Sequence, residues 1–380
     1  MTGREKIEAA FSEEGTAEIP AVFCYEGIYI RDHWEELTSC PWWYRATPEV
    51  ELQLEWRAEA FEKTGQDWFC LATCPSREDR ENTTIEARVD GVYHVDRRTG
   101  SGSLMTPPQV GGWSAAKGLH SICPEDPAQT PEEIDERIPI PESADARADL
   151  SDGRGDLAAE MLKAFGDDLY PIAHVASPLW RCYSLWGFEG MMTMVATRPD
   201  LVAHACERHL ANTVASVRET AALGASGIWI EECMTDMVGP DAFGSLCVRF
   251  LIPLVEEIRA AGMKSIYYYC GDPTGKWDHL LSVGADALSL EESKKGWEID
   301  IEDVVDRVGG RCTLLGNLDA MGLLQDGDDE ELRAGVDRQV AEGRRNGSRF
   351  IASTGSPITP PTSVTRVRRY CDLVHELGST

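Results

Sequence analysis

The sequence has little positive charge and no long apolar run. No stretch reaches the roughly eighteen consecutive apolar residues that a membrane-spanning helix needs, so we expect no membrane span. Lys and Arg total 36 against 65 Asp and Glu, which gives a formal net charge of −29 at pH 7. A chain this acidic repels phosphate backbones, which argues against nucleic-acid binding. Adaptation to salt and a basic partner surface would each account for the charge.

Nucleotide-binding and disulfide signatures are absent as well. No Gly-x-Gly-x-x-Gly follows a predicted strand, and no Gly-x-x-x-x-Gly-Lys-Ser/Thr occurs. The twelve cysteines include no Cys-x-x-Cys pair. The first residues lead into an amphipathic segment and lack the apolar core of a secretory signal. Thiols without an export signal are typical of a reducing compartment, so we predict a cytoplasmic protein with reduced cysteines.

What is present is a regular alternation of strand and helix patterns. The predicted strands are 20–26, 67–72, 169–176, 227–232, 265–270, 285–292, 312–317 and 349–354. The predicted helices among them are 47–64, 155–165, 198–222, 240–262, 276–282, 300–307, 328–345 and 362–377. Glycine stops such as Gly224 and Gly262 end several helices. About eight βα steps favour an α/β fold of the closed (β/α)8 TIM-barrel type over an open sheet.

The barrel is predicted to carry an N-terminal extension and one insertion within a single domain, residues 1–380. Residues 3–13 read as a short helix, and Thr47 reads as the cap of the helix that starts at Pro48. Residues 84–98 alternate around an Asp-Gly turn, which is a β-hairpin signature. Gly- and Pro-rich segments follow, so we assign residues 80–150 to a hairpin and loop insertion.

The predicted strand ends carry reactive side chains. The aromatic strand at 265–269 stops at Cys270, before a Gly-Asp-Pro turn, which is where barrel enzymes present their chemistry. The other ends offer Cys24, Glu26, Cys70, His174, Glu231, Glu232, Cys233, Tyr268, Glu291, Glu292, Asn317 and Ser353 to Ser356. Charges and thiols at one rim need a ligand, a metal or mutual partners. A buried structural cysteine and a solvated rim are the alternatives for any single position.

Five stretches carry a family resemblance. They are Gly224–Glu232, Tyr268–Asp272, Gly284–Glu291, Leu315–Asp319 and Phe350–Thr362. In this order they make residues 195–378 similar to the uroporphyrinogen decarboxylase superfamily. The resemblance implies a (β/α)8 barrel. It also implies one of several reactions: decarboxylation of a porphyrinogen, or methyl transfer in a corrinoid-dependent system. Such transferases either load a corrinoid protein from a methyl donor or unload it onto a thiol.

The motifs of two branches are incomplete here. The decarboxylases carry an N-terminal Arg-Pro-Pro-Trp motif that binds carboxylates, whereas residues 20–45 offer only Arg31, Arg45 and a Trp cluster. The thiol-methylating branch holds zinc with His-x-Cys and a late Cys. Tyr268 and Ser356 replace the first and last of these ligands, and only Cys270 is kept. Glu232 and Cys233 could substitute, which gives a predicted metal set of Glu232, Cys233 and Cys270 with zinc as the ion.

We therefore predict a methyltransferase that takes the methyl group from a small methylated donor, with an aryl methyl ether as the preferred candidate. The chain has no corrinoid-binding Asp-x-His-x-x-Gly motif, so the methyl group would pass to the Co(I) corrinoid of a partner protein. The predicted catalytic residues are Tyr268, Glu232, Glu291 and Asn317. The predicted substrate-binding residues are Trp34, Trp43, Cys24, Glu26, His174 and Ser356, with the tryptophans facing an aromatic ring.

Three alternatives stay open at this point. They are a methylcobamide:thiol methyltransferase with a zinc-activated thiol, a uroporphyrinogen-type decarboxylase, and a barrel that binds a corrinoid or porphyrin without catalysis. The number of reactive groups at the strand ends argues against the last of them.

Overall fold

The centre of the protein is a curled parallel sheet. The computed structural model describes residues 1–111, 124–141, 150–233, 235–294 and 296–379. The strands are, in spatial order, β1 (Trp68–Cys70), β5 (Tyr170–Ala176), β6 (Gly227–Glu232), β7 (Lys264–Tyr269), β8 (Ala287–Leu290), β9 (Thr313–Leu315) and β10 (Phe350–Ile351). Every neighbouring pair in this sheet is parallel, so all strands end at the same face.

Residues 20–22 fill the gap between the two outer strands. Ala21 forms a parallel bridge with Ala352. The Ala352 amide donates to the Pro20 carbonyl (2.9 Å), and the Val22 amide donates to the Ala352 carbonyl (2.8 Å). On the other side, the Asp67 amide donates to the Ala21 carbonyl at 2.8 Å. This segment therefore joins β10 to β1 and supplies the eighth stave, which confirms the predicted (β/α)8 barrel.

The predicted strand at 20–26 is wrong beyond this bridge. The backbone turns at Tyr25, whose φ is 58°, and helix α2 (Glu26–Asp32) begins at once. The predicted cap of the next long helix is also wrong. Helix α4 (Val50–Thr64) begins after Glu49, and the Thr47 hydroxyl bonds the Glu49 carboxylate rather than a helix amide. Local propensity could not reveal either turn, because both depend on contacts of neighbouring side chains.

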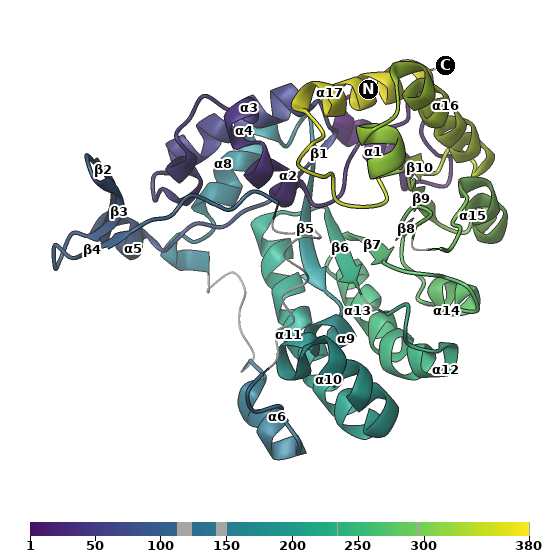
Figure 1. The fold of residues 1–380 in the computed structure, drawn as a ribbon, viewed down its shortest axis with the longest axis horizontal. Coiled ribbons are helices and arrows are strands. Elements are labelled where there is room, and N and C mark those ends of the chain that lie inside the picture. Colours follow the sequence, from purple (N-terminus) through teal and green to yellow (C-terminus); the bar gives the residue numbers. More distant parts are fainter. Residues whose placement is uncertain (112–123, 142–149, 234, 295, 380) are drawn as a thin grey trace.

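Helices surround the strands on the outside (Figure 1). Their bounds are α8 (Asp156–Phe165), α9 (Pro178–Arg181), α10 (Tyr183–Thr197), α11 (Pro199–Leu223), α12 (Pro240–Phe243), α13 (Arg249–Ala260), α14 (Trp277–Ser282), α15 (Ile301–Val308), α16 (Asp329–Arg345) and α17 (Val364–Gly378). Pro199 opens α11, and Gly224 ends it in the left-handed conformation at φ 95°. A proline at the first position and a glycine after the last are the usual boundaries of a helix.

Strand residues alternate between two cores. Trp229 of β6 and Tyr268 of β7 point into the barrel, whereas Ile230 and Tyr267 pack against the helices. Helix α1 (Gly3–Ala10) covers the amino-terminal end of the barrel, where its residue Ile7 joins the inner core. The barrel chemistry is therefore confined to the carboxyl-terminal end of the strands, which we call the mouth.

The insertion between β1 and β5 contains a small antiparallel sheet. Strands β2 (Thr83–Arg88) and β3 (Gly91–Asp96) form the predicted hairpin, and β4 (Gly102–Leu104) adds an edge that the sequence did not reveal. This sheet projects from the body of the molecule (Figure 1). Helix α5 (Arg77–Asn82) contacts β2, whereas α6 (Pro131–Arg137) packs against α11, away from this sheet (Figure 1). The rest of the predicted loop, residues 112–123 and 142–149, lies outside the described residues.

Short helical turns complete the structure before the barrel and at the mouth. They are α3 (Trp34–Leu37), the 3₁₀ turns at Trp42–Ala46 and Leu150–Asp152, and the π-helical turns at Gly244–Val248 and Ala320–Gln325. Across the part of the chain that the structure describes, every helix is too short or too polar to cross a membrane.

Candidate active site

An open cavity of about 640 Å³ runs from the mouth, where Tyr25, Cys70 and His174 line it, along the outer side of β5 to the C-terminal end of α11. Its apolar wall includes Ile28, Leu71 and Leu223, and its polar groups include Tyr25, Cys70, His174, Arg31 and Arg45. A cavity of this size accommodates a small molecule, and an apolar wall with a few polar groups is typical of small-ligand sites.

Tyr25 is the strained residue of this cavity. It adopts a left-handed backbone conformation at φ 58°, which a bulky residue rarely takes and which clusters at functional sites. Its hydroxyl donates to Glu231 Oε1 at 2.6 Å. Its ring meets Tyr268 edge-on, with centroids 5.9 Å apart. Burial raises the pKa of Tyr25 well above its usual value, and the neighbouring Cys233, Tyr268 and Glu231 raise it further. The hydroxyl therefore stays protonated and available as a hydrogen-bond donor.

Two thiols lie beside this pair at neighbouring strand ends. Cys233 Sγ donates to Glu231 Oε1 at 3.3 Å and lies 3.6 Å from the Tyr25 hydroxyl. A hydrogen bond with the Cys270 thiol, together with burial, raises the pKa of Cys233 well above its usual value. The Cys270 amide continues the ladder by donating to the Glu232 carbonyl at 2.9 Å. Glu231, Cys233 and Cys270 thus form one continuous arc of the mouth.

A second thiol group faces the cavity opposite an imidazole. Cys70 Sγ lies 3.4 Å from His174 Nε2. The His174 ring opens onto the cavity and stacks on Trp229, with centroids 5.8 Å apart. Surrounding protein atoms desolvate the imidazole and lower its pKa to about 4, so the ring is neutral at pH 7. Behind Cys70, burial raises the pKa of Glu26 to about 7, although its carboxylate accepts from Gln66 Nε2 at 2.6 Å.

A lysine organises the remaining arc of the mouth. Lys294 pairs with Glu291 and lies 3.9 Å from Glu292. Ser356 Oγ accepts from Lys294 and donates to Glu292 Oε2 at 2.7 Å. Burial lowers the pKa of Lys294, but the Glu292 and Glu291 carboxylates outweigh it and leave the pKa raised. The lysine is therefore a fixed cation beside two carboxylates, next to Cys270.

With the geometry in place, comparison with known proteins identifies the family. Residues 123–377 match the family described as uroporphyrinogen decarboxylase (URO-D). The chain belongs to the URO-D family. Curated uroporphyrinogen decarboxylases are its relatives. One from Thermodesulfovibrio yellowstonii is 29% identical over 160 residues, which cover 42% of this chain and 44% of the relative. One from Ralstonia nicotianae is 24% identical over 225 residues, or 55% and 60% of the two chains.

The chain thus spans about half the length of the curated URO-D relatives it matches. A solved structure described as a methyltransferase from Methanosarcina mazei aligns over 99% of both chains, with a TM-score of 0.66 and 18% identity. At this identity the likeness establishes the fold, and it covers the residues before 123 that the family model leaves unmatched.

The predicted catalytic residues lie in different parts of the barrel. Glu232 faces outward from β6, behind the mouth, where its Oε1 accepts from Ser177 Oγ at 2.8 Å. Glu291 lies at the mouth and pairs with Lys294. Asn317 bridges two loops, because its Nδ2 donates to the carbonyls of Glu291 (3.2 Å) and Ile299 (2.7 Å). Asn317 therefore positions the backbone beside Glu291.

Tyr268 lies in the barrel but uses its hydroxyl within the protein. The hydroxyl donates to the Gly355 carbonyl at 2.9 Å, and the residue is 1% exposed. Desolvation by burial raises its pKa well above the usual value. In this arrangement Tyr268 supports Tyr25 and the loop after β10, and its hydroxyl is turned away from the cavity that Tyr25 and His174 line.

The predicted substrate-binding residues fall into three groups. His174 lines the cavity, and Glu26 lies buried behind Cys70. Ser356 belongs to the Lys294 arc, and Cys24 is buried with its thiol 3.6 Å from the Thr354 hydroxyl. Trp34 packs in the outer core against Trp56 and donates to the Cys40 carbonyl at 2.7 Å; Trp43 lies half-buried against Trp42. The tryptophans do not line the cavity, so its aromatic character comes from Tyr25 and His174.

The predicted metal set is only partly assembled. Cys233 and Cys270 touch, but the Glu232 side chain points away from them to Ser177. Among the described residues, the only three potential ligands whose ligand atoms lie within 4.8 Å of one another are Cys40, Glu55 and Glu59, away from the mouth. The mouth as arranged does not fit a zinc centre of Glu232, Cys233 and Cys270. Zinc stays a prediction, and we derive no step through it.

The sequence interpretation missed Tyr25, Glu231 as the inward carboxylate, and Lys294. The alternation along β6 could have identified Glu231, because Trp229 and Glu231 share one face and Glu232 takes the other. No feature of the sequence predicts the positive φ of Tyr25. Lys294 lies in an irregular loop, so its return to the mouth depends on the tertiary structure.

The loop after β10 has no room for a side chain at Gly355. A Cβ there would lie 2.3 Å from the Glu292 amide nitrogen and 2.5 Å from Glu292 Oε2. We expect Gly355→Ala to lower the free energy of unfolding by about 1–3 kcal/mol, as overpacking does. Gly239→Ala is the matched control, since nothing lies within 4 Å of its Cβ position. Urea unfolding of both variants tests this prediction. Equal unfolding midpoints would contradict the claim that Gly355 has no room for a side chain.

Glu232 should make stability depend on pH. Burial raises its pKa to about 8, and its Oε2 has no hydrogen-bond partner. The folded state then binds a proton that the unfolded state releases, so this stability is present at low pH and is lost as pH rises through about 8. From about pH 6.5 to 8 the loss from Glu232 should be roughly 1–2 kcal/mol. Glu26 and His174 also contribute over part of this range, because burial raises the pKa of Glu26 to about 7 and a histidine in the unfolded chain titrates at about 6.5. The Glu232 contribution is therefore the difference between wild type and a variant that lacks this carboxyl.

Glu232→Gln keeps the shape and removes the titration. Its free energy of unfolding, measured in urea across the same pH range, should therefore rise relative to wild type as pH increases. Parallel pH profiles for the two proteins would contradict a neutral, buried Glu232 carboxyl.

Proposed function

We propose that this URO-D family member is a methyltransferase that removes a methyl group from a small methylated donor, in the first instance an aryl methyl ether. The acceptor would be the corrinoid of a partner protein. The observation that carries the proposal is the open cavity at the mouth with Tyr25 and Glu231 at its inner edge. A reactive centre of one donor hydroxyl and one carboxylate suits release of an oxygen leaving group.

Two further observations favour this reaction over decarboxylation of a porphyrinogen. A solved structure that aligns with 99% of the chain is described as a methyltransferase. The N-terminal Arg-Pro-Pro-Trp motif of the decarboxylases is missing from residues 20–45. Arg31 is the guanidinium nearest to that role, and it is bound by Asp32 at 2.7 and 3.0 Å. Arg45 also lines the cavity, so a polycarboxylate would find one guanidinium there besides the Asp32-bound Arg31.

The chain's own groups have defined tasks in this reaction. The apolar wall of Ile28, Leu71 and Leu223 would hold an aromatic ring and exclude water from it. Tyr25 would donate a hydrogen bond to the leaving oxygen, turning its proton from Glu231 to the substrate. The raised pKa of Tyr25 keeps that proton in place throughout the physiological range. When the partner docks, Co(I) would supply the nucleophile, which needs an in-line approach to the methyl carbon.

The proposal is tested by mixing the protein with a reduced corrinoid carrier and a panel of methyl donors, and following the Co(I) absorbance. Methoxylated phenols should consume Co(I), and no change should occur without the enzyme. If methanol, methylamines or a methyl thioether react and the aryl ethers do not, the donor class is wrong and the transferase assignment stands. If no donor reacts, the proposal is wrong.

The neighbouring thiols of Cys233 and Cys270 favour a second candidate function. In it, the enzyme transfers the methyl group from the corrinoid to a thiol. Among the described residues of the mouth, Cys233 and Cys270 are the pair that resembles the thiolate centre of that branch. In the same assay this candidate predicts loss of methylcobalt when a thiol is added, without consumption of Co(I) by any donor. The two functions thus give opposite results.

A further inference from the structure

We infer that Cys233 and Cys270 are a site of reversible oxidation, a dithiol that exchanges with small-molecule disulfides and closes into a disulfide across the strands β6 and β7. This site goes beyond the proposed reaction, and its chemistry can be tested without it. Its consequence for methyl transfer, given below, rests on the proposed function.

The register of the sheet places the two residues opposite each other. Glu232 pairs with Tyr269 at the end of the parallel ladder, and the two cysteines are the next residues along. The Cys270 amide still donates to the Glu232 carbonyl, so the ladder continues to this point. Opposed residues of neighbouring strands lie about 5 Å apart, which falls within the Cα separation of about 4.4–6.8 Å that a disulfide needs.

The side chains also point the right way. Both cysteines pack against the inner core of the barrel, so their side chains lie on the same face of the sheet. Both remain half-buried, so a small oxidant arriving at the mouth can reach them. Other close thiols differ in this respect: Cys182 and Cys206 are 3.7 Å apart but completely buried. Cys70, the other half-buried thiol at the mouth, has an imidazole as its neighbour.

The exchange proceeds by two displacements. The Cys270 thiolate attacks one sulfur of a small-molecule disulfide and releases the first thiol, which takes up the proton lost from Cys270. The ammonium group of Lys294 is close enough to interact with the Cys270 sulfur. Cys233 then attacks the Cys270 sulfur of the mixed disulfide and releases the second thiol. Two protein electrons reduce one small-molecule disulfide to two thiols, and one protein S–S bond forms.

Closure of this bond changes the proposed reaction centre. The Cys233 thiol is then no longer a donor to Glu231, and the sulfur beside the Tyr25 hydroxyl is held in a new position. Tyr25 and Glu231 would lose the arrangement that presents the hydroxyl to a leaving oxygen. The dithiol would therefore couple methyl transfer to the thiol–disulfide balance of the compartment.

The test uses the full-length protein and oxidised glutathione. After incubation, free thiols are alkylated with iodoacetamide and the peptides are mapped by mass spectrometry. We expect a Cys233–Cys270 crosslink, a fall of about tenfold or more in the alkylation of both thiols together, and full recovery with dithiothreitol. Cys233→Ser should instead trap glutathione on Cys270, because the second displacement is lost. Cys70 is the internal control and should form no crosslink.

The outcomes separate this inference from the proposed function. Crosslinking in a protein that methylates no corrinoid would leave the dithiol in place and remove only its proposed consequence. Free Cys233 and Cys270 after prolonged exposure to excess oxidised glutathione would overturn the inference. So would a crosslink of either residue to Cys70.

Discussion

Replacing Tyr25 by phenylalanine should slow methyl transfer by about a hundredfold or more, since this is the loss seen when one donor to a developing oxyanion is removed. The variant keeps the ring contact with Tyr268 and loses only the hydroxyl that donates to Glu231. We expect the decrease in kcat, with substrate affinity changed little. The measurement is the single-turnover rate of cobalt methylation at saturating donor, with near-ultraviolet circular dichroism to verify the fold.

Tyr268→Phe is the matched control. The Tyr268 hydroxyl donates its hydrogen bond to the Gly355 carbonyl. Removing this hydroxyl should therefore lower the stability of the fold and leave the transfer rate within a few-fold of wild type. The sequence alone predicts the reverse, with Tyr268 as the proton donor. A large loss of rate in Tyr268→Phe together with a small one in Tyr25→Phe would show that the cavity-facing tyrosine has been misassigned.

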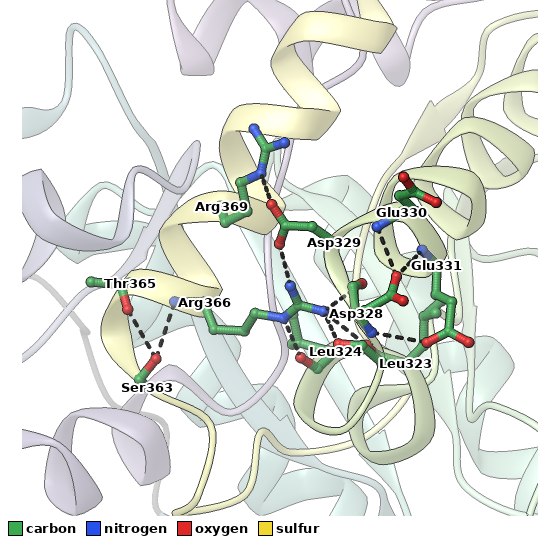
Figure 2. Close-up of polar contacts among 11 residues, drawn as sticks. Leu323, Leu324, Asp328, Asp329, Glu330, Glu331, Ser363, Thr365, Arg366 and Arg369 are labelled. Carbon is green, nitrogen blue, oxygen red and sulfur yellow. Dashed lines mark hydrogen bonds and ion pairs between the residues drawn. The ribbon is translucent and has the colours of Figure 1, made fainter.

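Replacing Arg366 by lysine should lower the free energy of unfolding by about 2–3 kcal/mol, because several carbonyls, most of them part-buried, lose a charged donor. Its guanidinium joins the starts of α16 and α17 (Figure 2). It donates to Asp329 Oδ1 at 2.7 Å, to the Leu324 carbonyl at 2.8 Å and to the Asp328 carbonyl at 3.0 Å. A lysine cannot reproduce this fork. These contacts hold two loops that follow β9 and β10 at the mouth.

Arg369→Lys is the control for charge and helix position. Arg369 makes one pair with the same aspartate, at 3.3 Å, and is 40% exposed, against 16% for Arg366 (Figure 2). Exposed pairs of this kind contribute little, so the control should stay within about 0.5 kcal/mol of wild type. Urea denaturation of the two variants at one pH gives the comparison. Equal losses would mean that the fork at Arg366 does not join the two helices.

The barrel could be predicted from sequence because its strands are short, apolar and separated by glycine stops. Strand β7 reads directly from Ser265–Tyr269, and α11 is bounded by Pro199 and Gly224. The first stave could not be assigned correctly. Residues 20–22 pair through a few bonds, and the chain then reverses at Tyr25 in a conformation that propensity disfavours for a bulky residue.

The sequence predicts chemistry at the strand ends, and the structure brings Tyr25, Glu231 and Cys233 together there, but the sequence did not show which side chains face inward. Alternation was the missing constraint: a shift of one residue exchanges the inward Glu231 for the outward Glu232. Residues whose roles depend on loops were beyond sequence reasoning. Lys294 reaches Glu291 and Ser356 through an irregular segment, and Trp34 enters the outer core rather than the cavity.

One measurement tests the central claim most directly. The wild-type protein is given a methoxylated phenol labelled with ¹³C in the methyl group, together with the reduced corrinoid carrier, and in parallel uroporphyrinogen alone. We predict ¹³C on the corrinoid by NMR, at a rate that falls in Tyr25→Phe, and no carbon dioxide from the porphyrinogen. Release of carbon dioxide without any labelled corrinoid would contradict the account.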